Sequence, residues 1–349
     1  MLKPILSISL IATACLVAAC DDTSTNTNPT GSSSSTAAGG SAGMGGDGGG
    51  GAGGAGGTAG GGNGGTGGTG GAMSSKDPLE GIGTVEKVQG NFQFTEGPQW
   101  IQSKSTLLFT DIPANKIIEH APPMMFATYV EPSSNANGLA VDKKGGLYAC
   151  EHSGRRISRI EPDKTVTSIV DNYQGKKFNS PNDIIIRDDG NIYFTDPPYG
   201  LPQGDPGELG YQGIFRVTPV NSVELIANDM SRPNGIALSP DQKTLYVNDT
   251  ASGELRTYAL GDNGLPGAMN KLVTTSPNPD GMAIDDQGNI FVTTSVGVEV
   301  YAPDGKLWGT IQVPEQPSNC AFGGADRKTL FITARTSLYR VTVQGTGMY

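Results

Sequence analysis

The sequence is poor in the residue types that build zinc centres, disulfide networks and nucleic-acid-binding surfaces. It contains only two histidines and four cysteines among 349 residues. Its formal net charge is −10 at pH 7, and no basic patch is visible, which argues against a nucleic acid as partner. No amphipathic helical stretch of any length is present, so a helical fold is not expected.

Hydrophobic runs long enough to span a membrane comfortably are also lacking. The apolar run Ile5–Ala19 follows the positively charged Lys3 and has the length of a targeting segment. It ends in Val17-Ala18-Ala19-Cys20, which resembles a bacterial lipoprotein cleavage box. We therefore predict that residues 1–19 are a lipoprotein signal peptide and that Cys20 carries the lipid; a plain secretory signal is the alternative. The mature protein is then an exported lipoprotein held at a periplasm-facing membrane or the cell surface, with the lipid anchor as its sole membrane contact.

The segment after Cys20 has almost nothing to bury. Residues 20–76 consist mainly of Gly, Ser, Thr, Ala and Asn. Burial of so little apolar surface does not offset the entropy lost on ordering, so we predict a disordered Gly/Ser-rich linker. Residues 77–349 remain as one globular domain, for which a monomer is the default expectation.

The globular part repeats one motif six times. In the clearest copy, a polar turn at 179–183 leads into the apolar run Ile184–Ile186, a tight turn at 188–191 and a second run, Ile192–Asp196. Two such runs around a tight turn are typical of a hairpin. The copies recur roughly every 40–50 residues, a period of short strands that is typical of propeller blades. The sequence therefore predicts an all-β fold, a six-bladed β-propeller with a central channel.

Two further expectations depend on the blade arrangement. Residues 85–88 precede the first hairpin and are expected to form the outer strand of the last blade, beside residues 338–343, which closes the ring. Cys150 and Cys320 fall on blades that are not neighbours. Although export permits a disulfide, we expect two buried free thiols.

One polar residue precedes the first strand of every copy. Because the innermost strand of each blade runs along the channel, these residues are expected to form a ring at one mouth of it: Glu96, Asn137, Asn182, Asn234, Asp280 and Asn319. Two carboxylates with amide oxygens suit a hard divalent cation, Ca²⁺ first and Mg²⁺ or Mn²⁺ as alternatives. Zn²⁺ is a weaker alternative, since it prefers His or Cys and neither occupies the ring. A purely structural explanation is that Asn-Gly and Asp-Gly cap strand-entry turns, although two carboxylates facing one channel would repel each other without a cation.

Several motifs, taken in order and register, carry a resemblance to a known family. They are Glu96–Trp100, Leu108–Pro113, Asn179–Asp183, Phe194–Gly200, Arg232–Gly235, Pro279–Met282 and Cys320–Gly324. In these motifs the chain resembles the senescence-marker-protein/gluconolactonase/luciferin-regenerating-enzyme-like family, in its bacterial gluconolactonase branch.

The resemblance implies a lactone-hydrolysing propeller with one catalytic divalent metal at the channel mouth. The family's metal ligands fall on Glu96, Asn234 and Asp280, and its proposed general base falls on Asp280. Asn182 matches a residue that contacts the metal or the substrate in relatives, and we predict it as a fourth ligand. The metal would polarise the lactone carbonyl while Asp280 activates a water or transfers a proton. Some animal members carry an Arg where this chain has Ser180, so sugar recognition by that Arg is not carried over.

Other polar residues are assigned places around the metal site or within the blades. Asn137 and Asn319, the remaining ring members, are predicted to bind substrate, as is His152, for which a hydrogen-bonded histidine within its blade is the alternative. Asp183 is expected to support the site from behind the ligands. The acids that end the second strands are expected to accept hydrogen bonds from turn amides and so hold the blades together: Asp111, Glu151, Asp196 and Asp249.

Two other functions compete with lactone hydrolysis. The same metal site would suit a phosphotriesterase or an aryl esterase, because fold and ligands do not fix the substrate. A non-catalytic binding propeller on a tether is the alternative from a different class. The carboxylates Glu96 and Asp280 argue against it, because a pure binding module does not need two carboxylates in its channel.

Overall fold

The computed structural model describes residues 77–348, and every regular element in that range is a β-strand. The predicted signal peptide, the lipidation site Cys20 and the predicted linker up to residue 76 lie outside the described residues. Within the described part of the chain, no helix is long and apolar enough to cross a membrane.

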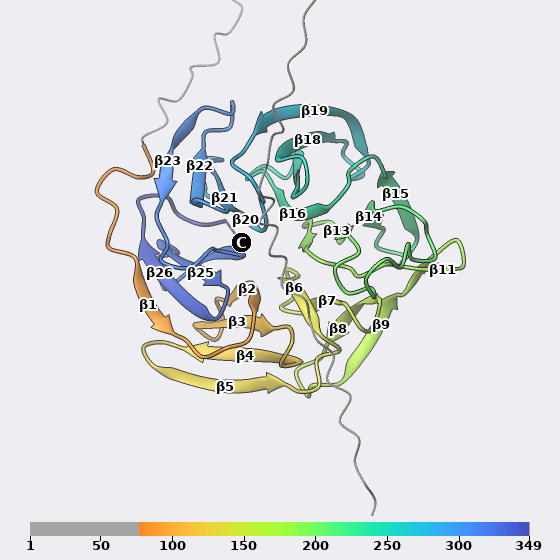
Figure 1. The fold of residues 1–349 in the computed structure, drawn as a ribbon, viewed down its shortest axis with the longest axis horizontal. Coiled ribbons are helices and arrows are strands. Elements are labelled where there is room, and N and C mark those ends of the chain that lie inside the picture. The colour runs from red at the N-terminus through yellow and green to blue at the C-terminus, as the bar shows by residue number, and fades with distance from the viewer. Residues whose placement is uncertain (1–76, 349) are drawn as a thin grey trace, which may run out of the picture. The chain divides into compact units, whose positions relative to one another are not determined.

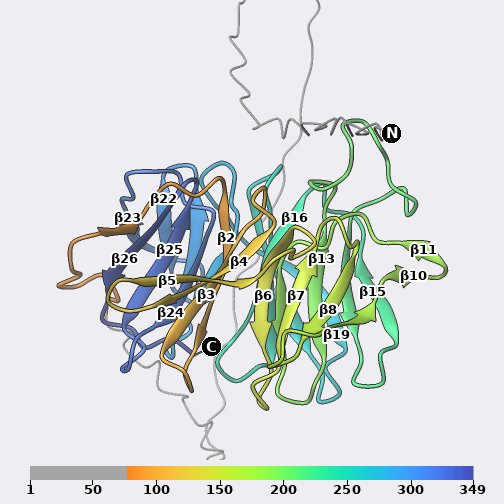
Figure 2. The ribbon, with the colours of Figure 1, turned by 90° about the horizontal axis from the view of Figure 1, so that it is seen from below.

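Six four-stranded antiparallel sheets surround a common centre (Figure 1), which confirms the six-bladed propeller. The first three blades are β2 (Thr95–Ile101), β3 (Thr106–Asp111), β4 (Lys116–Ala121) and β5 (Met125–Val130); β6 (Ala136–Val141), β7 (Leu147–Glu151), β8 (Arg156–Ile160) and β9 (Val166–Val170); and β12 (Ile184–Ile186), β13 (Ile192–Asp196), β14 (Gly213–Val217) and β15 (Val223–Ala227). The next two are β16 (Pro233–Leu238), β17 (Thr244–Asp249), β18 (Glu254–Leu260) and β19 (Pro266–Thr274); and β20 (Met282–Ile284), β21 (Ile290–Thr294), β22 (Gly297–Tyr301) and β23 (Leu307–Ile311). The sixth contains β24 (Asn319–Gly323), β25 (Thr329–Ala334), β26 (Ser337–Thr342) and β1 (Glu86–Gln89), and a separate hairpin of β10 (Asn172–Tyr173) and β11 (Lys176–Lys177) projects from one edge (Figure 2).

The repeated hairpin forms for local reasons that are clearest in blade three. Ile184 pairs with Phe194 and Ile186 with Ile192, so the alternating apolar side chains meet across the two strands. Between the strands, Gly190 adopts a φ of 88°, a left-handed conformation that glycine enters without steric cost. The Asp189 carboxylate accepts a hydrogen bond from the Asn191 amide at 3.1 Å, which fixes the turn.

The ring of blades is closed by pairing between the first and the last strand of the described chain. β1 pairs antiparallel with β26, with Glu86 opposite Arg340 and Lys87 opposite Tyr339. The predicted closing strand is therefore confirmed, displaced by one residue. This pairing covers the edge of β26, which would otherwise expose unpaired backbone groups.

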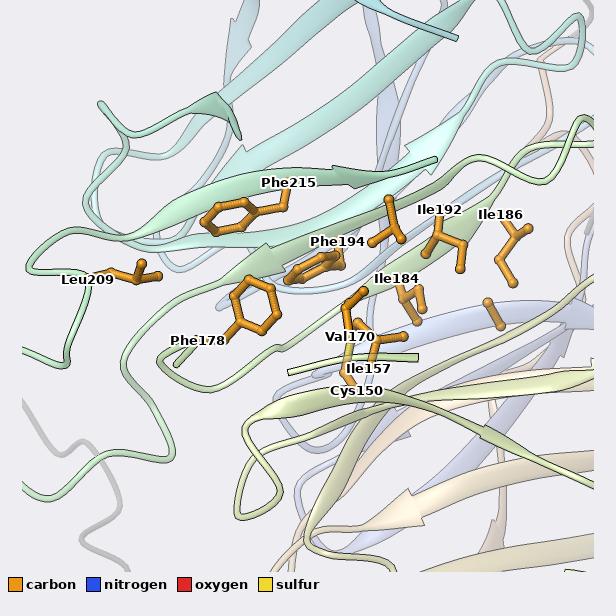
Figure 3. Close-up of a cluster of buried hydrophobic side chains, with 12 residues drawn as sticks. Cys150, Ile157, Val170, Phe178, Ile184, Ile186, Ile192, Phe194, Leu209 and Phe215 are labelled. Atoms are coloured by element: carbon orange, nitrogen blue, oxygen red, sulfur yellow. The ribbon is translucent and has the colours of Figure 1, made fainter. Parts of the chain in front are cut away.

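The hydrophobic core is divided into clusters rather than gathered in one place. Figure 3 shows the cluster around blade three, where Phe178, Phe194 and Phe215 pack with ring centroids 5.0–5.4 Å apart. Cys150 is buried in this same cluster and Cys320 in the cluster of blades five and six. Both are free thiols, as predicted.

Candidate active site

The six ring residues occupy equivalent places at the entry of the inner strands. Glu96, Asn137 and Asn234 are second in β2, β6 and β16, and Asn319 is first in β24. Asn182 and Asp280 each lie two residues before their strand, β12 and β20. In β2, β6 and β16 the pairing register shifts directly at or after the ring residue. Such bulges redirect a side chain.

Side chains of four ring residues meet across blades. The Asn319 amide donates a hydrogen bond of 3.1 Å to the Glu96 carboxylate, joining blade six to blade one. The carboxyl of Asp280 lies within hydrogen-bonding range of Glu96 and of the Asn234 amide. Residues from blades one, four, five and six therefore share one small space.

Glycines beside the ring residues allow the blades to come this close. A Cβ atom on Gly97 would clash with the carbonyl oxygen of Asn137, and one on Gly235 with that of Asp280. The Gly235 amide also donates to the Asp280 carbonyl oxygen at 3.0 Å. In each Glu-Gly, Asn-Gly and Asp-Gly pair, the glycine thus allows the inner strands to pack closely, while the preceding polar residue belongs to the ring.

The electrostatics of the mouth favour a cation. Burial raises the pKa of Glu96 well above its usual value, and the nearby negative charge of Asp280 raises it further. Burial likewise raises the pKa of Asp280, and the hydrogen bond from Asn234 opposes that rise. No ion pair joins either carboxylate to a lysine or arginine among residues 77–348. The charge of Arg335 lowers the pKa of Asp280 without forming a salt bridge. Two buried acids without a salt bridge fit a bound divalent ion.

The donor set is of the oxygen type. Within the described residues, no group of three or more His, Cys, Asp or Glu side chains is placed to hold a metal. The candidate ligands combine the Glu96 and Asp280 carboxylates with amide oxygens of Asn182 and Asn234, and such a mixture suits Ca²⁺ or Mg²⁺ better than Zn²⁺. Beside the mouth, inner-strand residues including Asp183, Ile236 and Cys320 enclose a cavity of about 60 Å³ in the channel.

His152 lies directly behind Asn137. The Asn137 amide nitrogen is 3.2 Å from His152 Nε2, and both side chains are buried. Burial lowers the pKa of His152 to about 4, so the ring is neutral near pH 7 and its Nε2 accepts from the amide. The Asn137 Oδ1 atom is buried and has no partner within the described residues.

Asn319 and Asp183 are engaged with the protein itself. Asn319 donates to Glu96 and accepts from the Cys320 amide at 2.8 Å, an arrangement that holds the Glu96 carboxylate. Asp183 accepts from the backbone amides of Ile184 at 3.0 Å and Ile236 at 3.2 Å, consistent with its expected supporting place.

Three of the four acids at strand ends behave as expected. Backbone amides donate to the carboxylates of Asp111, Asp196 and Asp249. Glu151 differs, because its carboxylate pairs with the guanidinium of Arg156 at 2.6 Å. For Glu151 the expectation was wrong: a neighbouring arginine on β8 takes the place of turn amides.

The sequence analysis missed Tyr199. Its side chain lies within hydrogen-bonding range of Thr250 and Asn234 and close to the charge of Asp280. Burial raises its pKa to about 12, and the charge of Asp280 contributes to that rise. The one signal in the sequence was its presence in the Phe194–Gly200 motif.

Residues 94–336 match the model of the SMP-30/Gluconolactonase/LRE-like region. The chain belongs to this family. It is 38% identical over 302 residues to a gluconolactonase of Zymomonas mobilis, which covers 78% of this chain and 85% of that protein.

Two solved structures share the fold, and the first of them also supports the family assignment. A gluconolactonase from Xanthomonas campestris has a TM-score of 0.72 at 32% identity, covering 76% of this chain and 91% of that one. A calcium-binding regucalcin from Agrobacterium tumefaciens has a TM-score of 0.67 at 20% identity, with coverage of 76% and 96%. At that identity the second comparison shows the shared propeller alone.

Proposed function

We propose that this protein is a metal-dependent lactonase, with Glu96, Asn182, Asn234 and Asp280 holding a divalent cation. The observation that carries the proposal is the convergence of two buried carboxylates, neither of them in a salt bridge, with the side chains of Asn234 and Asn319 at the channel mouth. The gluconolactonase relatives support a lactone-hydrolysing enzyme as the function class. Ca²⁺ is the proposed ion, because the donors are hard oxygens.

In this proposal each residue has a defined part. A divalent ion in the site would supply Lewis acidity toward the lactone carbonyl. Asp280 takes a proton from the attacking water and returns it to the ring oxygen that leaves, so the ester bond is exchanged for an acid and an alcohol. Asn319 holds the Glu96 carboxylate in place through its 3.1 Å hydrogen bond. The free Asn137 Oδ1 accepts a hydrogen bond from a substrate hydroxyl, with His152 fixing the orientation of that amide.

The test is lactone hydrolysis by a chain without residues 1–19 in which Cys20 is replaced by Ser. Acid release from glucono-1,5-lactone, above the spontaneous rate, is followed with EDTA, with added Ca²⁺ and in the Asp280→Ala variant. We expect EDTA and the substitution each to abolish turnover, and Ca²⁺ to restore only the first loss. The matched control is Asp188→Ala, which changes an exposed turn acid paired with Lys143.

Other outcomes identify the alternatives. If wild-type protein binds Ca²⁺ but hydrolyses only aryl esters or phosphotriesters, the metal site is right and the substrate class is wrong. If calorimetry detects no metal binding and EDTA has no effect, the ring is structural and a binding propeller is the better proposal.

We also propose that the protein is a monomer anchored by lipid on Cys20. Replacing Cys20 by Ser should then release the protein from the membrane fraction of the producing bacterium. Retention of the Cys20→Ser protein in that fraction would contradict the anchor.

A further inference from the structure

The connection between β13 and β14, residues 197–212, is fixed beside the mouth at both of its ends. The Asn179 amide donates to the carbonyl oxygens of Asp196 at 3.0 Å and Tyr211 at 2.8 Å. Leu209 is buried in the aromatic cluster of blade three, beside Phe178 and Phe215 (Figure 3). The connection is therefore part of the folded blade.

Ser180 fixes the first turn of this connection. Its hydroxyl donates to the Pro197 carbonyl oxygen at 2.6 Å and accepts from the Gly200 amide at 2.8 Å. Ser180 is fully buried, and it lies two residues before the candidate ligand Asn182. A Cβ atom on Gly200 would come within 2.8 Å of the Cβ atoms of both Ser180 and His152. The turn is thus packed against the floor of the site with no room to shift inward.

This turn carries Tyr199 to the candidate metal centre. The Tyr199 phenol lies within hydrogen-bonding range of Thr250 and Asn234, whose side chains are themselves bonded at 3.0 Å. The residue keeps 38% of its surface exposed. It therefore borders both the buried ligands and the open side from which a substrate enters.

We propose that Tyr199 is a specificity-determining residue whose phenol oxygen accepts a hydrogen bond from a hydroxyl of a polyhydroxylated lactone, and that Ser180 is the positioning residue that holds it there. The phenol hydrogen is directed at Thr250, whose own hydroxyl donates to the Pro279 carbonyl oxygen at 2.7 Å. The proposal rests on the proposed lactonase function. A cation bound to the carbonyl oxygen would activate every lactone in the same way. Selection among lactones therefore needs a polar side chain that contacts the hydroxyl groups on the rest of the lactone ring. A site built to hydrogen-bond a substrate hydroxyl rejects analogues that lack it.

The experiment compares glucono-1,5-lactone with δ-valerolactone, which has the same ring without hydroxyls. Tyr199→Phe should raise KM for glucono-1,5-lactone about 3–10-fold, the range of one neutral hydrogen bond. The kcat for glucono-1,5-lactone, and both kcat and KM for δ-valerolactone, should stay within about 2-fold of the wild-type values. Ser180→Ala should give the same split, and the double variant should be no worse than either single one, because both changes remove the same contact.

Matched controls separate this from a general effect on folding. Tyr211→Phe removes a hydroxyl from the same connection, and Ser158→Ala removes a buried hydroxyl that has no partner among the described residues. Both control variants should have wild-type kcat and KM values on both lactones. Ca²⁺ affinity should be equal in all variants. Ser180→Ala should also lower the thermal midpoint, because two buried hydrogen bonds are lost, so the difference between the two lactones, which a merely structural role would not produce, is the readout for its positioning role.

A readout without turnover makes a failure of this proposal distinguishable from a failure of the proposed function. Calorimetry with 1,5-anhydroglucitol, a polyol ring without a carbonyl, should show binding that Tyr199→Phe weakens about 3–10-fold. Equal losses on both lactones, or unchanged KM in Tyr199→Phe with unchanged polyol binding, would overturn the role of Tyr199. An effect of Tyr199→Phe without one of Ser180→Ala would overturn the role of Ser180. Wild-type protein that binds the polyol but opens no lactone would contradict the proposed function alone.

Discussion

At the scale of single residues, Glu96 shows how a buried acid is kept in a protein interior. Its carboxylate accepts from the Gly97 amide at 2.8 Å and from Asn319 at 3.1 Å, yet burial still raises its pKa. Two hydrogen bonds therefore do not offset the loss of water. A bound cation would supply the missing compensation.

Removing the charge of Glu96 should weaken cation binding more than it weakens the fold. We expect Glu96→Gln to lower Ca²⁺ affinity at least ~10-fold, because one of two ligand charges is lost at a buried site. Calorimetric titration of Ca²⁺ measures the effect. The control is Glu224→Gln on the outer strand β15, where the acid pairs with Arg216 at 2.9 Å. Equal affinities in the two variants would exclude Glu96 as a ligand.

His152 should give the protein a specific acid sensitivity. Its pKa is lowered to about 4 by burial, whereas an unfolded histidine titrates near 6.5. Between these values the unfolded chain binds a proton that native His152 does not, so this contribution to stability is present above pH 6.5 and is lost as the pH falls toward 4.

The variant His152→Gln isolates that effect. From pH 7.5 to pH 4, the wild type should lose ~3 kcal/mol more unfolding free energy than the variant, measured by urea titration in EDTA. Burial raises the pKa of Asp183 to about 7 and of Asp196 to about 8, which acts in the opposite direction. The contributions of Asp183 and Asp196 are the same in the wild type and the variant, so they cancel when the two unfolding free energies are subtracted. Parallel pH profiles would show that His152 is protonated in the native state.

At the scale of elements, the close approach of inner strands depends on glycine for two separable reasons. Gly97 has a φ of 47° and faces the backbone of blade two, whereas Gly145 has a φ of 81° and open space around its Cβ position. Both substitutions to alanine strain the backbone by about 1–2 kcal/mol. Only the change at position 97 adds a clash with a neighbouring strand.

Gly97→Ala should therefore destabilise the protein by at least ~2 kcal/mol more than Gly145→Ala. Denaturant midpoints of the two variants provide the comparison. Because the clash is with the carbonyl of Asn137, we also expect lower activity in Gly97→Ala and wild-type activity in Gly145→Ala. Similar midpoints would mean that the inner strands can separate without cost.

The hairpins were predictable from sequence, and the connections between them were less so. Alternating apolar residues around a turn such as Asp188–Asn191 specify a local structure, and repetition then gives the number of blades. The ring residues followed from that register. Tyr199 could not be found this way, because its placement depends on Ser180 and Asn179, which hold a long connection through contacts without any periodic pattern. Glu151 was misassigned for a similar reason, since its partner Arg156 takes the acid by an ion pair that the turn pattern does not reveal.

At the scale of the whole molecule, stability should depend on the closing strand. Outside its pairing with β26, β1 is held by Lys87, which contacts Glu315 at 3.1 Å, and by Val88, which packs against the core cluster around Phe109. A chain that begins at residue 91 lacks β1 and should have a thermal midpoint at least ~5 °C below that of a chain beginning at residue 77. It should also self-associate through the uncovered edge of β26. Equal midpoints and a monomeric elution profile for both chains would contradict this account.

The hydrogen bond between Glu96 and Asn319 affects the order of events during folding. It joins residues 223 positions apart, across the same junction that β1 and β26 close. Blades can form hairpin by hairpin from local contacts, but this contact has to wait until both ends of the ring have met. During refolding, secondary structure should therefore return before the cation site. The chain should pass through an inactive intermediate in which the blades have formed but Glu96, the first candidate ligand in the sequence, has not yet reached Asn319.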